Sequence, residues 1–463
     1  MMQNLARGQP LSPTVNPDIY NFAKSYAAMI RRLQNDPAIT VEENRTLIRK
    51  FLESREARGL SVPRVVKYGN QLIVVARFCA KQFNSMDADD IRELLVRLKN
   101  QGKHGNCWRN YGTKYSDNTM CDIKIFLKVF WRWMKGMDES KPIYPQEVSW
   151  FTKGKVKASS VTRSDLLTED EIELLAGATG NAQDCALVKV LDDAGGRIAE
   201  ILTLRIGDVE RRPYGFKLNV WVSKTYAHPI PIARSAPALA RWLSLHPFRD
   251  NPKAPLWLNS KLGQLRYQSA SWKMKNIVAC AEQTTGKTFW KRVFFHLFRH
   301  TSATEFMSKA KGSQGVMNKK YGWSANSNMP AVYSHLVDTD VEEAVARADA
   351  HVDDLSNMMG QKEQPRPKKC PRCEGTNDPS AKYCSRCAFP LDGKAAIEAF
   401  EAEEKKSEAE GLLGKLLNDE RVRKVMLEVL SEVSAEKISR EVASPSSLVH
   451  LLPDHEGERK TKQ

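Results

Sequence analysis

The sequence predicts a mainly α-helical protein with several domains and little β-structure. Three observations support this class. Apolar residues recur at helical spacing along most of the 463-residue chain, two short alternating segments interrupt them near the middle, and four cysteines form two CxxC pairs in the last quarter. At roughly 150 residues per domain, the length is enough for about three folded units.

The first 150 residues divide into an appendage and a helical domain. Residues 1–37 contain four prolines and one candidate helix, and we expect them to lie outside the domain that follows. Residues 38–150 predict a small all-helical domain, because apolar stripes recur there at helical spacing. Its helices are expected from residue 40, at 62–82, at 87–100 and at 117–135.

Positive charge is concentrated in this first part of the chain. The whole sequence holds 71 lysines and arginines against 55 acidic residues, a formal charge of +16, and residues 1–160 hold 27 against 15, or +12. The loop at 102–115 and Lys153, Lys155 and Lys157 add basic stretches between helices. This balance favours a polyanionic partner, nucleic acid first, although a solvated basic surface is the simpler alternative.

A second domain is expected after a linker at 151–163. Residues 164–355 predict a mostly helical domain with a small sheet, and its first helix begins with an apparent capping box from Thr168 to Glu171. The other helices are expected at 182–193, 198–204, 237–245, 269–283, 297–309, 315–321 and 341–349, and strands at 217–222 and 228–232.

The last hundred residues begin with a candidate metal site. Cys370 and Cys373 form one CxxC pair and Cys384 and Cys387 the other, ten residues apart, which is the arrangement that tetrahedral Zn²⁺ prefers. We predict a structural zinc ribbon at 368–392 and a helical segment at 394–441, whose apolar stripe suits protein contacts. A flexible tail is expected at 442–463.

Composition also bears on where the protein acts. No run reaches the roughly 18 apolar residues of a membrane span, and the N-terminus lacks the apolar core of a signal peptide. Four of the nine cysteines form the two CxxC pairs, and the other five are scattered, which indicates reduced thiols. We therefore expect a cytoplasmic protein with no membrane partner.

Three segments of the second domain suit phosphate chemistry. Arg197 follows two glycines at the start of a helix, where it could bind a phosphate, although a lone arginine more often forms a structural salt bridge. His296 and Arg299 share one helix face, a pairing suited to proton transfer, although a histidine among phenylalanines is usually part of the core. Tyr333, ten residues after Trp323, becomes a useful nucleophile only where cations stabilise its anion.

Together these residues resemble the tyrosine recombinases, also called phage-type integrases. The resemblance covers about residues 38–350, and the sequence around Trp323 and Tyr333 looks most like archaeal members of the family. Four signatures occur in order: Arg197 with Glu200, Lys224-Thr225 between two strands, the HxxR box at His296 and Arg299, and Tyr333 after Trp323.

The resemblance implies a fold and a reaction. Residues 38–150 would form a SAM-like core-binding domain and residues 164–355 the recombinase catalytic domain, the two enclosing DNA. Tyr333 would attack a DNA phosphodiester and leave a 3′-phosphotyrosyl enzyme with a free 5′-hydroxyl, without a metal or another cofactor in the chemistry. The other implied roles are phosphate binding by Arg197 and Arg299, proton handling by His296 and Lys224, and an indole N–H donated by Trp323.

The resemblance also implies partners. Family members bind double-stranded DNA at specific sites and commonly act as homotetramers at synapsis. We therefore expect a site-specific recombinase, carried by a mobile element or acting on chromosome or plasmid dimers in the nucleoid. The alternatives are a catalytically silent DNA-binding regulator or architectural protein on the same fold, and a topoisomerase that relaxes DNA without choosing a partner site.

Overall fold

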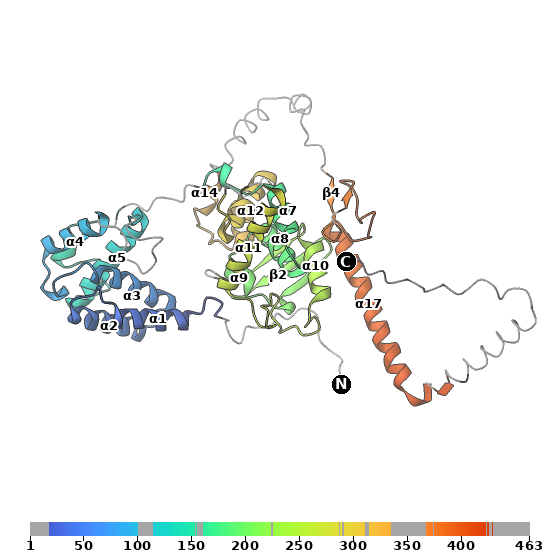
Figure 1. The fold of residues 1–463 in the computed structure, drawn as a ribbon, viewed down its shortest axis with the longest axis horizontal. Coiled ribbons are helices and arrows are strands. Elements are labelled where there is room, and N and C mark those ends of the chain that lie inside the picture. The colour runs from blue at the N-terminus through green and yellow to red at the C-terminus, as the bar shows by residue number, and fades with distance from the viewer. Residues whose placement is uncertain are drawn as a thin grey trace, which may run out of the picture.

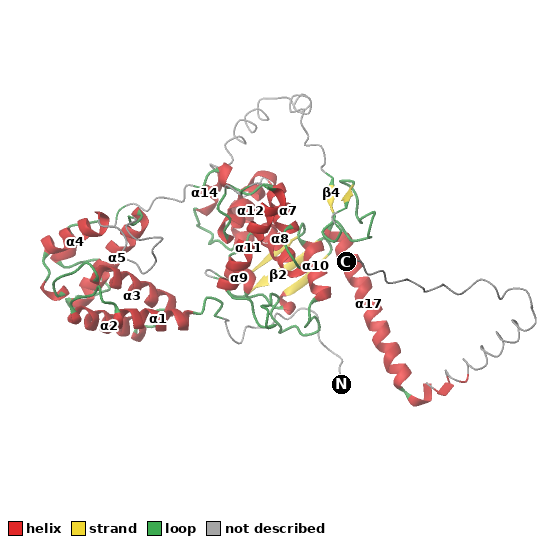
Figure 2. Ribbon diagram, in the orientation of Figure 1, coloured by secondary structure: helices red, strands yellow, loops and turns green. Residues whose placement is uncertain are grey.

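The computed structural model describes residues 18–100, 114–152, 154, 161–223, 226–286, 288, 291–310, 314–334, 367–373, 375–422, 424–425 and 428. These residues form an N-terminal unit (22–151), a central unit (161–334) and a C-terminal unit (367–418), shown in Figures 1 and 2. The mainly α-helical class with small sheets is confirmed. Within these ranges, no helix combines the length and the apolar character needed to cross a membrane.

The N-terminal unit is a helical bundle around an aromatic core. Phe51, Phe130 and Trp131 have no exposed surface, and the rings of Phe51 and Phe130 meet edge to face at 5.2 Å. Ser116 accepts a 3.2 Å hydrogen bond from the N–H of Thr119 and so caps the fifth helix. The helices are α1 (Phe22–Asn35), α2 (Glu42–Ala57), α3 (Val62–Ala76), α4 (Ala88–Asn100), α5 (Asp117–Met134) and α6 (Gln146–Ser149).

The helix α1 belongs to this bundle, which corrects the expected appendage at 1–37. It packs along α3, and its Met29 and Leu33 lie in the same core as Phe51. The Met29 side chain lies so close to Gly69 that a side chain at 69 would collide with its sulfur. The sequence showed the candidate helix but not that its apolar stripe packs against α3.

The central unit surrounds a three-stranded antiparallel sheet in the order β1-β2-β3. Inward and outward residues alternate along β3, and Ile230 of that strand faces Leu218 of β2. The predicted capping box forms, since Thr168 accepts from the Glu171 N–H and Glu171 from the Thr168 N–H. The elements are α7 (Glu169–Gly177), α8 (Ala182–Ala194), α9 (Ile198–Leu202), β1 (Val209–Arg212), β2 (Gly215–Val220), β3 (His228–Ile232), α10 (Ala236–Leu245), α11 (Tyr267–Thr285), α12 (Phe295–Ala310), α13 (Gln314–Tyr321) and α14 (Met329–Ser334).

The sequence did not predict one strand of this unit, and it predicted one helix that the described residues do not cover. The strand β1 was not expected, because its residues Val-Glu-Arg-Arg show no apolar alternation; pairing with β2 makes it a strand. The helix expected at 341–349 lies outside the described residues.

The chain crosses between the N-terminal and central units twice. Ile19 lies in the core of the central unit, its carbonyl accepts a 3.0 Å hydrogen bond from the Tyr267 N–H, and Tyr20 packs on the Tyr267 ring at 5.0 Å. Only then does the chain enter α1. The second crossing runs through 151–163, where residues 153 and 155–160 lie outside the described residues.

The C-terminal unit pairs two short strands with one long helix. The strands are β4 (Lys368–Lys369) and β5 (Thr376–Asn377), and the helix is α17 (Gly393–Asn418). The start of α17 lies along α10 and contacts β2, and its far end projects away from the central unit (Figure 1). The helical segment expected at 394–441 thus begins as predicted, but a bend at Asp419 interrupts it.

Candidate active site

Arg197 lies at the start of α9, directly after the tight turn that ends α8. Gly195 makes that turn with a φ of +56°, and a Cβ there would lie 2.6 Å from both Ser302 Oγ and the Tyr321 ring. Only glycine combines this backbone conformation with so little space. The pair of glycines therefore brings Arg197 close to residues of α12 and α13.

Glu200 holds Arg197 in position. Its carboxylate accepts 2.7 Å hydrogen bonds from the backbone N–H and from Nη1 of Arg197, and a 2.8 Å bond from Ser223 Oγ. The Glu200 side chain is 1% exposed, whereas that of Arg197 is 26% exposed. Arg197 thus forms the structural ion pair while part of its side chain stays exposed to solvent.

Arg299 is a buried cation that lies 4.0 Å from the same Glu200 carboxylate. Its Nη1 donates to the Gly195 carbonyl at 2.9 Å and its Nη2 to the Tyr321 carbonyl at 2.7 Å. The guanidinium also lies 5.5 Å from the ring centres of Tyr321 and Trp323. Burial lowers the pKa of Arg299, as does Arg197, but an arginine stays protonated in proteins.

Tyr333 completes a stack of three aromatic rings. Tyr321 and Trp323 stack at 5.1 Å, and Trp323 and Tyr333 at 5.5 Å with their planes only 13° apart. Tyr333 is fully buried, and its hydroxyl has no hydrogen-bond partner among the described residues. Burial raises the pKa of this hydroxyl, and the nearby Arg299 and Arg197 oppose that rise. A buried hydroxyl without a partner costs free energy, because it has given up its hydrogen bonds to water.

Two histidines of α12 line the same region. His296 and His300 meet edge to face at 4.7 Å, and His300 lies 5.6 Å from the Tyr333 ring. Loss of hydration, then Arg299 and Arg197, lower the pKa of His296. Burial, then His296, lower the pKa of His300 to about 4. Both imidazoles are therefore neutral at pH 7 and able to accept a proton.

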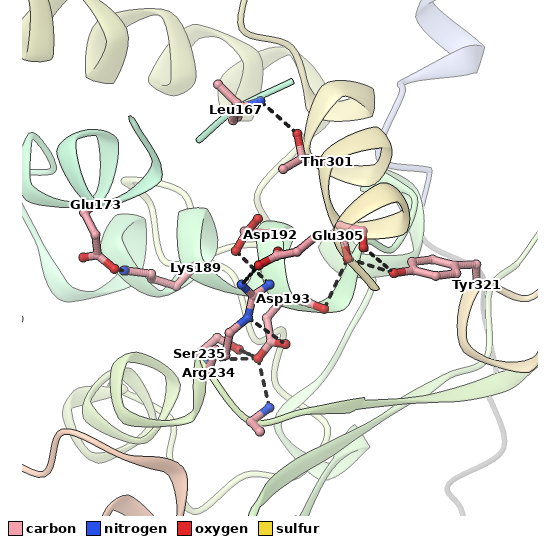
Figure 3. Close-up of polar contacts among 12 residues, drawn as sticks. Leu167, Glu173, Lys189, Asp192, Asp193, Arg234, Ser235, Thr301, Glu305 and Tyr321 are labelled. Atoms are coloured by element: carbon pink, nitrogen blue, oxygen red, sulfur yellow. Dashed lines mark hydrogen bonds and ion pairs between the residues drawn. The ribbon is translucent and has the colours of Figure 1, made fainter. Parts of the chain in front are cut away.

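A charged network supports the helices that carry the two arginines. Asp193 accepts 2.9 Å hydrogen bonds from the N–H and Oγ of Ser235. Arg234 donates to Glu305 at 2.9 Å and pairs with Asp192 at 3.2 Å (Figure 3). The network joins the end of α8 to α12 across the turn that follows β3.

The structure brings together most of the residues that the sequence singled out. These residues converge on one region from four segments: Arg197, the α12 pair His296 and Arg299, Trp323, and Tyr333. Lys224 lies outside the described residues.

Sequence reasoning missed two residues of this region. His300 follows His296 by four positions and so shares its helix face, a spacing that the sequence displays. Tyr321 joins the stack because α13 packs against α12. No local sequence pattern predicts this contact.

The four cysteines of the C-terminal unit form a separate cluster. Their sulfur atoms all lie within 4.8 Å of one another, and the Cys370–Cys387 and Cys373–Cys384 sulfurs are 3.6 Å apart. Thiolates around a tetrahedral zinc at about 2.3 Å would lie about 3.8 Å apart. The geometry therefore fits a four-coordinate metal ion.

Comparison with known proteins shows which family the central unit is similar to. Residues 165–339 match the phage integrase family. A search of curated proteins gives no match. The chain is also similar to the solved structure of the XerA recombinase, with 20% identity over 66% of this chain and 99% of the other and a TM-score of 0.34. A lambda integrase dimer bound to a COC' core site is 16% identical over 62% of this chain and 76% of the other, with a TM-score of 0.48. The XerH site-specific recombinase bound to difH substrate is 16% identical over 74% of this chain and 99% of the other, with a TM-score of 0.45.

Proposed function

We propose that the chain is a site-specific DNA recombinase that cuts and rejoins strands through a covalent phosphotyrosine, a proposal supported by the match of residues 165–339 to the phage integrase family. The observation that supports this most strongly is the convergence on Tyr333: a buried hydroxyl without a partner, stacked on Trp323, with Arg299 and Arg197 opposing the rise in its pKa. A protein that only bound DNA would have no use for this arrangement.

In the proposed reaction, Tyr333 Oη attacks a DNA phosphorus. The P–O5′ bond breaks, the enzyme keeps a 3′-phosphotyrosyl bond, and the 5′-oxygen leaves as a hydroxyl. Arg197 and Arg299 offset the charge that develops on the nonbridging oxygens. His296 is neutral at pH 7 and accepts the tyrosine proton, Lys224 protonates the leaving oxygen, and the Trp323 indole N–H donates to the phosphate.

The partners follow from this reaction. Double-stranded DNA is the substrate, and exchange between two duplexes needs four active tyrosines, hence a homotetramer at synapsis. The similar structures include a lambda integrase tetramer bound to a Holliday junction and the XerH site-specific recombinase bound to difH substrate. A chromosomal or plasmid substrate places the protein in the cytoplasm with the nucleoid.

We propose Zn²⁺ as the ligand of Cys370, Cys373, Cys384 and Cys387. Four thiolates at this spacing leave no open coordination position, so the ion has a structural role and takes no part in strand cleavage. The two arginines provide the positive charge that a catalytic metal would otherwise supply.

The decisive experiment traps the covalent intermediate. The wild-type protein is incubated with nicked suicide DNA substrates in EDTA, followed by denaturing electrophoresis, with relaxation of supercoiled plasmid in parallel. We expect an adduct and relaxation, both abolished in Tyr333→Phe, which keeps the ring on Trp323 and removes only the hydroxyl. The zinc content is measured alongside, so that loss of the ribbon metal is not taken for a metal requirement of the chemistry.

Tyr321→Phe is the matched control, since it removes a buried hydroxyl from the same stack. It should still form the adduct. An adduct that persists in Tyr333→Phe contradicts the proposed nucleophile. Tight DNA binding without adduct or relaxation supports the silent regulator, and relaxation without strand exchange supports a topoisomerase.

A further inference from the structure

The C-terminal unit is docked on the central unit. Ala396 and Ile397 of α17 are 1% and 6% exposed and belong to the same apolar core as Phe216 and Leu218 of β2. The Phe400 ring meets that of Phe216 edge to face at 6.4 Å. The first turns of α17 therefore complete the core beside the sheet.

Polar contacts fix both ends of this interface. Arg211 of β1 lies 4.5 Å over the Phe400 ring and forms an ion pair with Glu404. On the ribbon side, Arg241 of α10 donates a 3.0 Å hydrogen bond to the carbonyl of Pro371, next to the first cysteine. The cysteine cluster and α17 thus contact the central unit at two separate places.

The first residue of α17, Gly393, packs tightly against the backbone of the central unit. A Cβ at Gly393 would lie 2.4 Å from the Tyr214 carbonyl oxygen and 3.0 Å from that of Ala233. These oxygens belong to the β1–β2 turn and to the end of β3. The helix can lie here only because residue 393 is a glycine.

The ribbon joins α17 without a loose linker. The Leu391 N–H donates to the Lys382 carbonyl at 2.7 Å, and Asp392 caps the helix by accepting from the Ala395 N–H at 2.8 Å. Among the described residues of the ribbon, the apolar cluster contains, apart from cysteines, only Phe389 and Leu391. So small a core does not hold a fold by itself, and the metal must supply the stability.

The supported sheet leads toward the candidate active site. After β2 the chain passes Ser223, which donates to Glu200 at 2.8 Å, and Tyr226, whose hydroxyl donates to the Trp323 carbonyl at 3.1 Å. The position of β2 therefore affects the residues that hold Arg197 and Trp323.

We propose that the four-cysteine ribbon is a zinc-dependent support: Zn²⁺ keeps the ribbon folded, the folded ribbon holds the start of α17 against α10 and β2, and the docked helix fixes the sheet whose β2–β3 connection reaches the candidate active site. The inference rests on the proposed zinc site and is independent of the recombinase activity.

The test uses the full chain and no DNA. Zinc is measured by elemental analysis, and hydrogen–deuterium exchange is followed in peptides from 393–404 and 211–220, with α3 (62–76) as internal reference. We expect one zinc per chain. In the double variant Cys384→Ser, Cys387→Ser, zinc is lost and both test peptides exchange at least about tenfold faster, while α3 is unchanged.

A second pair of variants separates docking from metal binding. Gly393→Ala should keep its zinc yet show faster exchange in both test peptides, because the new methyl collides with backbone. Gly411→Ala, on the projecting part of the same helix with no atom within 4 Å of the added Cβ, should change neither peptide. A chain that binds no Zn²⁺, or a zinc-free variant whose α17 peptide keeps full protection, overturns the proposal.

Discussion

At the scale of single residues, Arg299 is held by geometry that only a guanidinium can satisfy. It donates at once to the carbonyl oxygens of Gly195, just after α8, and of Tyr321, at the end of α13, and it lies beside the stacked rings of Tyr321 and Trp323. A lysine carries the same charge but has one compact ammonium group, which cannot span both acceptors. Arg197, in contrast, is partly exposed and has its carboxylate partner three residues away.

Arg299→Lys should therefore lower the free energy of unfolding by about 3 kcal/mol, because it leaves a buried carbonyl unpaired and loses the ring contacts. Arg197→Lys should cost less than about 1 kcal/mol. Chemical denaturation measures both. Equal stability losses in the two variants would show that the buried contacts of Arg299 contribute nothing special.

Asp192 makes the stability of the native protein depend on pH. The carboxyl is buried, its Oδ1 has no hydrogen-bond partner among the described residues, and burial raises its pKa to about 7 against the pull of Arg234. An unfolded aspartate has a pKa of about 4. The native state therefore holds this proton more tightly, and the stability it contributes is lost as the pH rises from about 4 through 7.

Asp192→Asn removes that titration. We expect the variant to gain stability relative to the wild type between pH 5 and pH 8, by at most about 1.4 kcal/mol per unit of pKa difference. Denaturation at both pH values measures the gain, and groups common to both proteins cancel. Glu173→Gln, at an exposed carboxylate that pairs with Lys189, is the control and should show no such trend. A pH-independent difference between Asp192→Asn and wild type would refute the assignment.

At the scale of elements, α12 is fixed by a few buried polar contacts. Thr301 accepts a 3.1 Å hydrogen bond from the Leu167 N–H, which ties α12 to the segment before α7 (Figure 3). One turn later, the Thr304 hydroxyl is also buried but has no partner in the part of the chain that the structure describes. One helix therefore contains a threonine whose hydroxyl accepts a hydrogen bond, Thr301, and one whose hydroxyl has no partner among the described residues, Thr304.

Thr301→Val should destabilise the protein by about 1–3 kcal/mol, because the Leu167 N–H would be buried without an acceptor. Thr304→Val replaces an unpaired hydroxyl with a methyl of similar size, so it should be neutral or stabilising. Thermal melts compare the two. The reverse order of stabilities would contradict the hydrogen-bond pattern of α12.

At the scale of the whole molecule, charge and chemistry lie in different parts of the chain. Residues 1–160 carry +12 of the total +16, whereas the residues of the candidate active site lie beyond residue 190. Binding to DNA should therefore depend on the first part of the chain even where cleavage depends on the second.

Changing Lys153, Lys155 and Lys157 to glutamine should weaken DNA binding and reduce the slope of log affinity against log salt by up to about 2.7, since each phosphate contact contributes about 0.9. The control changes Lys394, Lys406 and Lys415 of α17 to glutamine, with the same loss of net charge. Titrations at several salt concentrations distinguish them. An equal effect of both triple variants would mean that total charge, and not its position, governs binding.

The sequence alone determined the local features of this protein. Apolar periodicity located α3, α4 and α5, because a helix that buries one face repeats that face every three to four residues. The capping box of α7 and the paired cysteines were equally readable, since both depend on residues close together in the chain. The set of candidate site residues came from motifs of the same local kind, and they remain proposals until the trapping experiment.

Only the tertiary structure decided what those local features contact. That α1 joins the N-terminal bundle, that Tyr333 stacks on Trp323 beside His300, and that α17 completes the core of the central unit are all outcomes of packing. Each depends on shape and burial between segments that are separate in sequence, and the free energy of such contacts is not encoded in either segment alone. Arg299 shows this most directly, because its two acceptors lie 104 and 22 residues away along the chain.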